Sequence, residues 1–119
     1  MLNDATGFQK VFIITGRTDL RYGIDRLVAT VEAMSGEKPL VPNTLYLFCG
    51  RRSDRIKGLV WERDGYCLVY KRLEAGNFQW PRNTNEVKQL SGKQFRWLME
   101  GLTISPKKLV KEVSPEYLE

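Results

Sequence analysis

Four basic side chains lie close together in one short stretch, which reads Arg51-Arg52-Ser53-Asp54-Arg55-Ile56-Lys57. A guanidinium group can donate two parallel hydrogen bonds to a phosphate, and an ammonium group adds a point charge. Two further basic residues, Lys71 and Arg72, follow in a later strand-like segment. The pattern therefore predicts a surface that binds the DNA phosphate backbone, made of Arg51, Arg52, Arg55, Lys57, Lys71 and Arg72. The alternative is a solvated strand end whose arginines pair with Asp54 and Glu74.

Aromatic side chains are interleaved with these basic residues. Aromatic rings that face solvent can stack on exposed nucleic-acid bases, and Trp61, Tyr70 and Trp80 are the candidates for this role. The alternative is that these rings belong to the core or to cross-strand pairs, as large aromatic residues often do. The sequence leaves both open, because the outcome depends on which side of a strand each ring occupies.

The chain contains no histidine. A Ser-His-Asp or Cys-His nucleophile therefore cannot be assembled, and no histidine can act as a general base near neutral pH. Asp19, Asp54 and Asp64 fit helix caps and turns better than a metal cluster for phosphoryl chemistry. Cys49 and Cys67 form no CxxC pair, and we expect two reduced, buried thiols. We therefore expect a protein that is not an enzyme, with no catalytic residue, metal, cofactor or small-molecule substrate.

Length and composition are those of one ordinary globular domain. The chain has 119 residues, of which 42% are hydrophobic and 28% are charged, so it can bury a core without disulfides or metals. We expect a single domain over residues 1–119, with an ordered core of about 9–103 and a tail of 104–119. The net charge of +5 and the pI near 9.4 favour an acidic partner such as nucleic acid. Neither a signal-peptide pattern nor an apolar stretch of about 20 residues is present, so the expected location is the cytoplasm, with no membrane partner.

Short apolar runs predict several strands. The β-branched run over residues 10–15 suits a buried strand, and alternating patterns indicate strands over 44–49, 55–62 and 66–73. Residues 77–80 are expected to add a further short antiparallel strand. The polar stretch over 81–88 is expected to be a loop.

Two helices are predicted from apolar spacing and capping signals. The main helix is expected over Leu20–Met34, with Thr18 or Asp19 as its cap and Gly36 as its stop. Gly23 would then lie inside this helix and permit close approach of another element. A capping-box sequence that begins at Ser91 starts a shorter C-terminal helix. Residues 105–106 are expected to open a last short helix.

The dipeptide Asp64-Gly65 between two strand-like runs predicts a β-hairpin. A two-residue turn would pair Trp61 with Leu68, whereas a three-residue turn would pair Glu62 with Tyr66. We expect the two-residue turn, because it leaves one coherent aliphatic face for a helix to cover. One face would then carry Arg55, Lys57, Trp61, Tyr70 and Arg72, and the other Ile56, Val60, Cys67, Val69 and Leu73.

Together these elements predict an α+β fold. We expect an antiparallel sheet of four to five strands, whose central meander contains the Asp-Gly hairpin. The main amphipathic helix over Leu20–Met34 would pack on the aliphatic face. The C-terminal helix would close an edge or share that face.

Three blocks of residues carry a family likeness when they are taken in order. They are Thr15–Arg21 with Ile24–Leu27, then Arg51–Lys57 leading to Trp61, then Asp64–Tyr66 continuing through Tyr70–Glu74 to Gly76, Phe78, Trp80 and Pro81. In this arrangement the chain resembles the small TnpB-type accessory proteins that the second open reading frame of bacterial insertion elements of the insertion sequence 66 family encodes. The likeness spans about Val11–Gly101 and departs from the family pattern at Leu20, Arg26 and Glu62-Arg63.

The resemblance implies a role in DNA transposition beside a separate, larger transposase that carries the catalytic centre. It provides no catalytic residue to carry over to this chain. Two hypotheses remain open at this point. The chain is either an accessory factor that binds DNA through its basic surface or a protein-interaction module that docks on the transposase of the same element.

Overall fold

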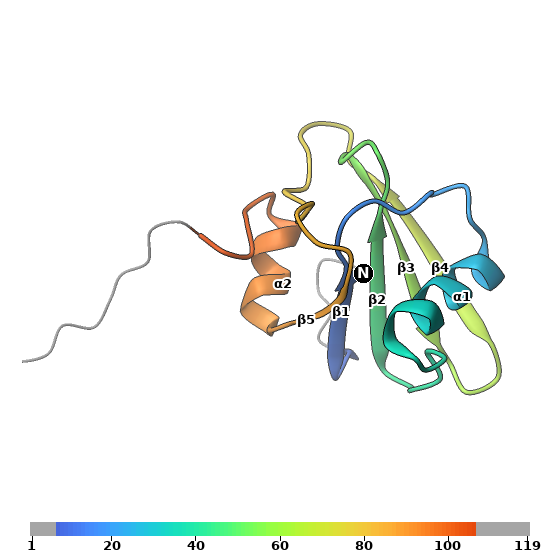
Figure 1. Ribbon diagram of the computed structural model, residues 1–119. Helices are drawn as coiled ribbons and strands as arrows, with labels where there is room; N and C mark the ends of the chain where they lie inside the picture. Colours follow the sequence, from blue (N-terminus) through green and yellow to red (C-terminus); the bar gives the residue numbers. More distant parts are fainter. Residues whose placement is uncertain (1–6, 107–119) are drawn as a thin grey trace, which may run out of the picture.

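The computed structural model describes residues 7–106 and contains one five-stranded sheet and two helices (Figure 1). In chain order the elements are β1 (Lys10–Ile14), α1 (Ile24–Ser35), β2 (Thr44–Cys49), β3 (Arg55–Trp61), β4 (Tyr66–Arg72), β5 (Val87–Leu90) and α2 (Gly92–Met99). The strands lie in the order β4-β3-β2-β1-β5. The predicted α+β class and strand number are confirmed. The expectations for residues 1–6 and for the tail beyond 106, including the last short helix, lie outside the described residues.

The sheet is mixed, which differs from the antiparallel sheet expected from the sequence. β1 and β2 run parallel, with Lys10 opposite Thr44 and Ile14 opposite Phe48. The remaining neighbours are antiparallel. Parallel strands need a long crossover connection, and the segment containing α1 provides it. This crossover brings the carboxyl ends of β1 and β2 to the same end of the sheet.

The strand expected over residues 77–80 does not form. The side chains of Phe78 and Trp80 are instead buried in the core, at 2% and 6% exposure. The edge strand beside β1 is β5, which begins within the stretch expected to be a loop and pairs Val11 with Leu90. Pairing partners outside the local sequence therefore decided which apolar segment became a strand.

Helix α1 begins four residues later than predicted. Gly23 is its N-cap residue, in an extended conformation and without a side-chain cap, so it lies at the start of the helix and not inside it. The carboxylate of Asp19 accepts hydrogen bonds from Arg21 and leaves the helix start uncapped. The stop at Gly36 is confirmed, because this residue adopts the left-handed conformation with φ of 83°. The capping box between Ser91 and Gln94 at the start of α2 is also confirmed.

The β3–β4 hairpin has a longer turn than either predicted register. Trp61 pairs with Tyr66, so four residues, 62–65, make the connection. Arg63 adopts a positive φ of 72°, and the Glu62 N–H donates to the Gly65 carbonyl oxygen at 2.8 Å. The pairing is shifted by two residues from the predicted two-residue turn. Because side chains alternate with a period of two, this shift leaves the predicted division into faces correct.

Both faces of the sheet are covered, and the main helix lies on the face opposite to the one predicted. α1 packs its buried Leu27 and Val31 on the face that also carries the basic hairpin residues, against Ile14, Phe48 and Leu59. The aliphatic face is covered by the C-terminal part of the chain, chiefly Phe78, Trp80, Phe95 and Leu98. Helix α1 therefore packs on apolar side chains of β1, β2 and β3, on the same face as Arg55, Lys57 and Arg72. Neither described helix is long and apolar enough to cross a membrane.

Candidate nucleic-acid interface

Two loops meet where the chain leaves the carboxyl ends of β1 and β2. In Figure 1 they are the blue segment after β1 and the green segment after β2, at the upper end of the sheet. The Thr18 N–H donates to the Cys49 carbonyl oxygen at 2.9 Å, and Thr18 is buried. Parallel strands end at the same edge, and this edge is where open sheets commonly bind ligands. The arrangement brings Arg17 and Arg51 to the walls of one groove.

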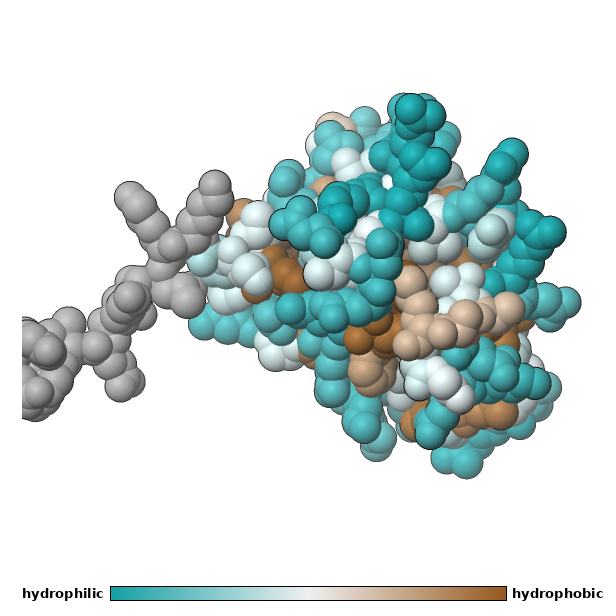
Figure 2. Space-filling view, in the orientation of Figure 1, coloured by the Kyte–Doolittle hydropathy of each residue, from teal (hydrophilic) through white to brown (hydrophobic). Residues whose placement is uncertain are grey.

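This groove, here called the arginine groove, has a volume of about 530 Å³ and is lined by five arginines and one tyrosine. They are Arg17, Arg21, Arg51, Arg52, Arg55 and Tyr70. In Figure 2 hydrophilic residues cover the upper part of the molecule, where the two loops lie, and hydrophobic residues gather across the middle of the same view. The groove therefore concentrates positive charge at one end of the sheet.

The arginines of the groove differ in how they are paired. Arg17 and Arg51 are exposed, and within residues 7–106 the structure pairs neither of them with a carboxylate. Arg55 Nε donates to Asp54 Oδ1 at 2.8 Å, while Arg52 Nη2 lies 3.6 Å from Asp54 Oδ2. The hydrogen bond from Arg55 lowers the pKa of Asp54. The predicted alternative, a strand end with internally paired arginines, thus holds for Arg52 and Arg55 and fails for Arg51.

Asp19 is the acidic residue within the groove. Arg21 holds its carboxylate with Nη2 to Oδ2 at 2.7 Å and with its backbone N–H to Oδ1 at 2.9 Å. This hydrogen bonding lowers the pKa of Asp19 to about 2, so the group is ionised at neutral pH. Five arginines against Asp19 and Asp54 still leave a net charge of +3. The groove is therefore suited to an anionic ligand.

The remaining predicted basic residues, Lys57, Lys71 and Arg72, do not line the groove. Lys57 Nζ donates to the Tyr22 carbonyl oxygen at 2.9 Å, so it holds the segment before α1 in place. Arg72 pairs with Glu74 at 3.0 Å. Lys71 is opposite Ile56 in the register and occupies the other face of the sheet from Arg72, because neighbouring side chains on a strand alternate. The single surface expected from the sequence is therefore wrong for Lys71.

The three predicted stacking residues occupy three different environments. Trp80 is only 6% exposed and its Nε1–H donates to the Ile14 carbonyl oxygen at 3.0 Å, so of the two alternatives it is a core ring and not a candidate for stacking on bases. Trp61 is half-buried against Tyr66, with ring centroids 4.9 Å apart. Tyr70 is 51% exposed and lines the arginine groove. Of the three, Tyr70 is thus the ring that is placed to meet a ligand in the groove.

Sequence reasoning missed the side chain that joins the two loops. Arg82 Nη1 donates to the Gly16 carbonyl oxygen at 2.8 Å, and its Nη2 donates to the Gly50 carbonyl oxygen at 2.6 Å. The same Nη2 lies 3.5 Å from Cys49 Sγ. Arg82 therefore fixes the backbone on both sides of the groove, although no local pattern marked it.

Arg17 and Arg21 were also missed as groove residues. A signal for them existed, because both belong to the block Thr15–Arg21 that carries part of the family likeness. Nothing local indicated that this block would lie beside Arg51. That proximity arises only from the parallel pairing of β1 with β2.

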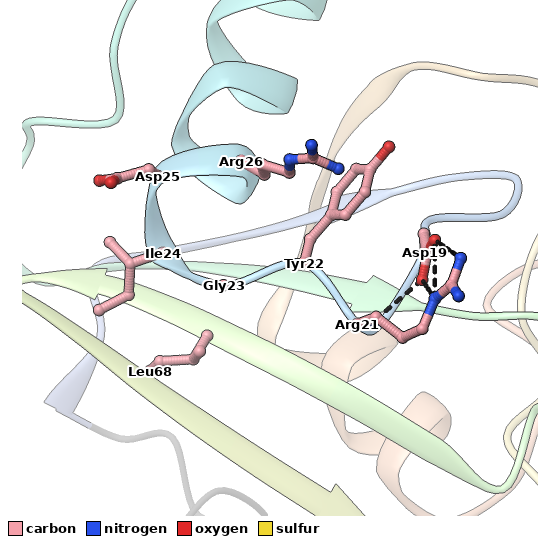
Figure 3. A pocket seen from close by; sticks show the side chains of 8 residues that line it. All are labelled: Asp19, Arg21, Tyr22, Gly23, Ile24, Asp25, Arg26 and Leu68. Atoms are coloured by element: carbon pink, nitrogen blue, oxygen red, sulfur yellow. Dashed lines mark hydrogen bonds and ion pairs between the residues drawn. The ribbon is translucent and has the colours of Figure 1, made fainter.

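A second cavity, here called the Arg26 cavity, adjoins the arginine groove at the start of α1 (Figure 3). Its volume is about 1040 Å³, and it shares Asp19 and Arg21 with the groove. The Arg26 guanidinium lies over the Tyr22 ring, 5.1 Å from the centroid, and Leu68 of β4 lines the other side. Within residues 7–106, no three His, Cys, Asp or Glu side chains come together as a group that could hold a metal ion.

Comparison with known proteins identifies the family. The chain is 34% identical over 93 residues to the uncharacterized protein y4hO of Sinorhizobium fredii, an alignment that covers 78% of this chain and 80% of that protein. It is 29% identical over 93 residues to a second uncharacterized protein of the same organism, y4jC, with coverage of 78% and 79%. No solved structure matches the chain. A family model described as IS66 Orf2 like protein matches residues 9–109. The chain therefore belongs to the IS66 Orf2-like family of transposition accessory proteins from bacterial insertion elements.

Proposed function

We propose that this accessory protein binds DNA through the arginine groove and catalyses no reaction itself. The observation that carries the proposal is the meeting of Arg17 and Arg51, two exposed arginines without carboxylate partners in the described part of the chain, on the two loops of one groove. Membership of a family of transposition accessory proteins supports DNA as the anionic partner.

The chemistry of the groove suits phosphate groups. A guanidinium group presents a planar fork of donors that matches two phosphate oxygens, and it stays charged at any physiological pH. Arg17 and Arg51 supply such forks from separate loops, which Arg82 holds together. Contacts of this kind position DNA without reading its sequence. We therefore propose binding that depends strongly on salt and weakly on base sequence.

Salt dependence tests this proposal. The double variant Arg17→Ala, Arg51→Ala removes two phosphate contacts, so the slope of log K against log salt concentration becomes shallower by about 1.8 for duplex DNA. The affinity of this variant for DNA at low salt should also be lower than that of the parent. The measurement is fluorescence anisotropy of a labelled duplex over a series of salt concentrations.

The matched control is Lys38→Ala, Arg96→Ala, which removes the same charge from two exposed residues outside the groove. This variant keeps the parent's slope if the groove is the binding site. Binding through the groove is refuted if the parent does not bind DNA, or if the control variant loses as much affinity as the groove variant.

A second candidate function is docking on the transposase of the same element. A cleft of about 250 Å³ beside the end of α1 contains Phe12 and Tyr46, whose rings stack with centroids 5.2 Å apart. Val41 lines this cleft and is 54% exposed, although it is apolar. Exposed apolar groups beside a cleft favour a protein partner. Val41→Asp should then abolish co-purification with the purified transposase and leave DNA binding unchanged.

A further inference from the structure

The arginine groove and the Arg26 cavity adjoin each other beside β4, and the two hollows together are here called the depression. They share Asp19 and Arg21. Arg51 and Arg52 also line the first hollow, whereas Asp25 and Arg26 line the second. Tyr70 lines the first part and Leu68 the second. These two residues are two positions apart on one strand, so their side chains stand next to each other on the same face. The depression thus has arginines along its sides and an aromatic and an aliphatic side chain from β4.

The shape of this depression favours one strand of nucleic acid over two. Arg17 and Arg51 come from separate loops and line the same hollow. A single sugar-phosphate chain can enter such a hollow and turn its bases toward Tyr70. A duplex carries its phosphates on the outside of a stiff cylinder and keeps its bases paired inside. Its paired bases are therefore not free to stack on the Tyr70 ring.

Tyr70 has the properties of a stacking platform. The residue is 51% exposed, whereas the rings of Trp61 and Tyr66 on the same face pack against each other. Arg55 lines the groove together with Tyr70. Proteins that bind single strands without sequence preference combine a positively charged groove with such exposed rings, because every base has a face that can stack.

We propose that the groove binds single-stranded DNA, with one base stacked on Tyr70 and the phosphates held by Arg17 and Arg51. This inference rests on the proposed function and adds the form of the nucleic acid. Charge contacts alone favour duplex DNA, whose charge density is higher. A preference for single strands must therefore come from base contacts, and the exposed ring in the groove is the group that provides them.

The test compares a labelled 12-nucleotide single strand with the 12-base-pair duplex of the same sequence, at one salt concentration. The proteins are the parent, Tyr70→Phe and Tyr70→Leu, and all three are checked for an unchanged melting temperature. The parent should bind the single strand about tenfold or more tightly than the duplex. Tyr70→Leu should weaken single-strand binding by about fivefold to 150-fold, the range for loss of one stacked base. Tyr70→Phe, which keeps the ring, should bind like the parent.

Several outcomes overturn the inference. Equal or tighter binding of the duplex does so, as does a Tyr70→Leu variant that binds the single strand as the parent does. Tighter binding of the matching RNA strand would also assign the groove to a different ligand. If the duplex is preferred and binding still depends on Arg17 and Arg51, the inference fails while the proposed function stands. If neither form of DNA binds, both fail.

Discussion

Arg82 should stabilise the fold through the two loops that it joins. Its guanidinium makes two hydrogen bonds to backbone carbonyl oxygens, to Gly16 at 2.8 Å and to Gly50 at 2.6 Å. A typical hydrogen bond contributes about 1 kcal/mol net to stability, and bonds from charged groups contribute more. The Arg82 residue is exposed overall, so we take the lower value for each bond. Arg82→Ala should then lower the free energy of unfolding by about 2 kcal/mol.

Two measurements check this expectation. Equilibrium unfolding in urea gives the change in free energy, and Arg82→Lys, which can replace one bond at most, should lose about half as much. Amide hydrogen exchange then locates the effect. The Thr18 N–H is held by the Cys49 carbonyl oxygen between the two loops, so it should exchange much faster in Arg82→Ala. The amide of Leu27 in α1 should change only as far as global stability requires.

The role given to Arg82 would be refuted by a loss of stability below about 0.5 kcal/mol, the usual effect of a surface substitution. It would equally be refuted if Thr18 exchanged at the parent's rate. In either case the loops would be held by other contacts, and the groove would not depend on this side chain.

Two further predictions concern the loop after β1. Gly16 has a φ of 78°, and an added Cβ would lie 2.8 Å from the Thr84 carbonyl oxygen and would overlap the Asn85 side chain. Gly16→Ala should therefore lower the free energy of unfolding by about 2–4 kcal/mol, measured by urea unfolding. A variant as stable as the parent would contradict this. Asp19 has its pKa lowered from 3.8 to about 2 by its hydrogen bonds with Arg21. A lowered pKa in the folded state adds stability above pH 4 that is lost as the pH falls toward 2, and Arg21→Ala should return the Asp19 carboxyl titration, followed by NMR, toward 3.8. An unchanged titration in that variant would show that Arg21 is not the cause.

Local features of this chain could be read from the sequence because their causes are local. The left-handed stop at Gly36 depends on one glycine, and the capping box depends on Ser91 and Gln94, three residues apart. The division of the β3–β4 hairpin into faces followed from alternation together with a turn of even length. It stayed correct although the turn was two residues longer than predicted, because a shift of two residues preserves the faces.

The errors have a common cause in contacts over long sequence distances. Helix α1 was expected on the aliphatic face, but it packs on the opposite face, against Phe48 and Leu59. Trp80 was a candidate for stacking on bases, but its side chain is buried and its Nε1–H donates to the carbonyl oxygen of Ile14, 66 residues away in the sequence. The hydrophobic pattern of a sequence indicates that a side chain will be buried, but it does not identify the residues against which that side chain packs.

The sequence by itself determined four of the five strands, the two helices of the described chain, the basic stretch that begins at Arg51, and the family. Only the tertiary structure decided that the chain has an arginine groove. The parallel pairing of β1 with β2 places Arg17 beside the loop of Arg51, and Arg82 reaches back over 66 residues to Gly16 to hold the two loops together. Local propensity acts over a few residues, whereas strand pairing joins segments of any separation. The sequence therefore predicted one wall of the candidate site, the loop that begins at Arg51, but not the opposite wall with Arg17.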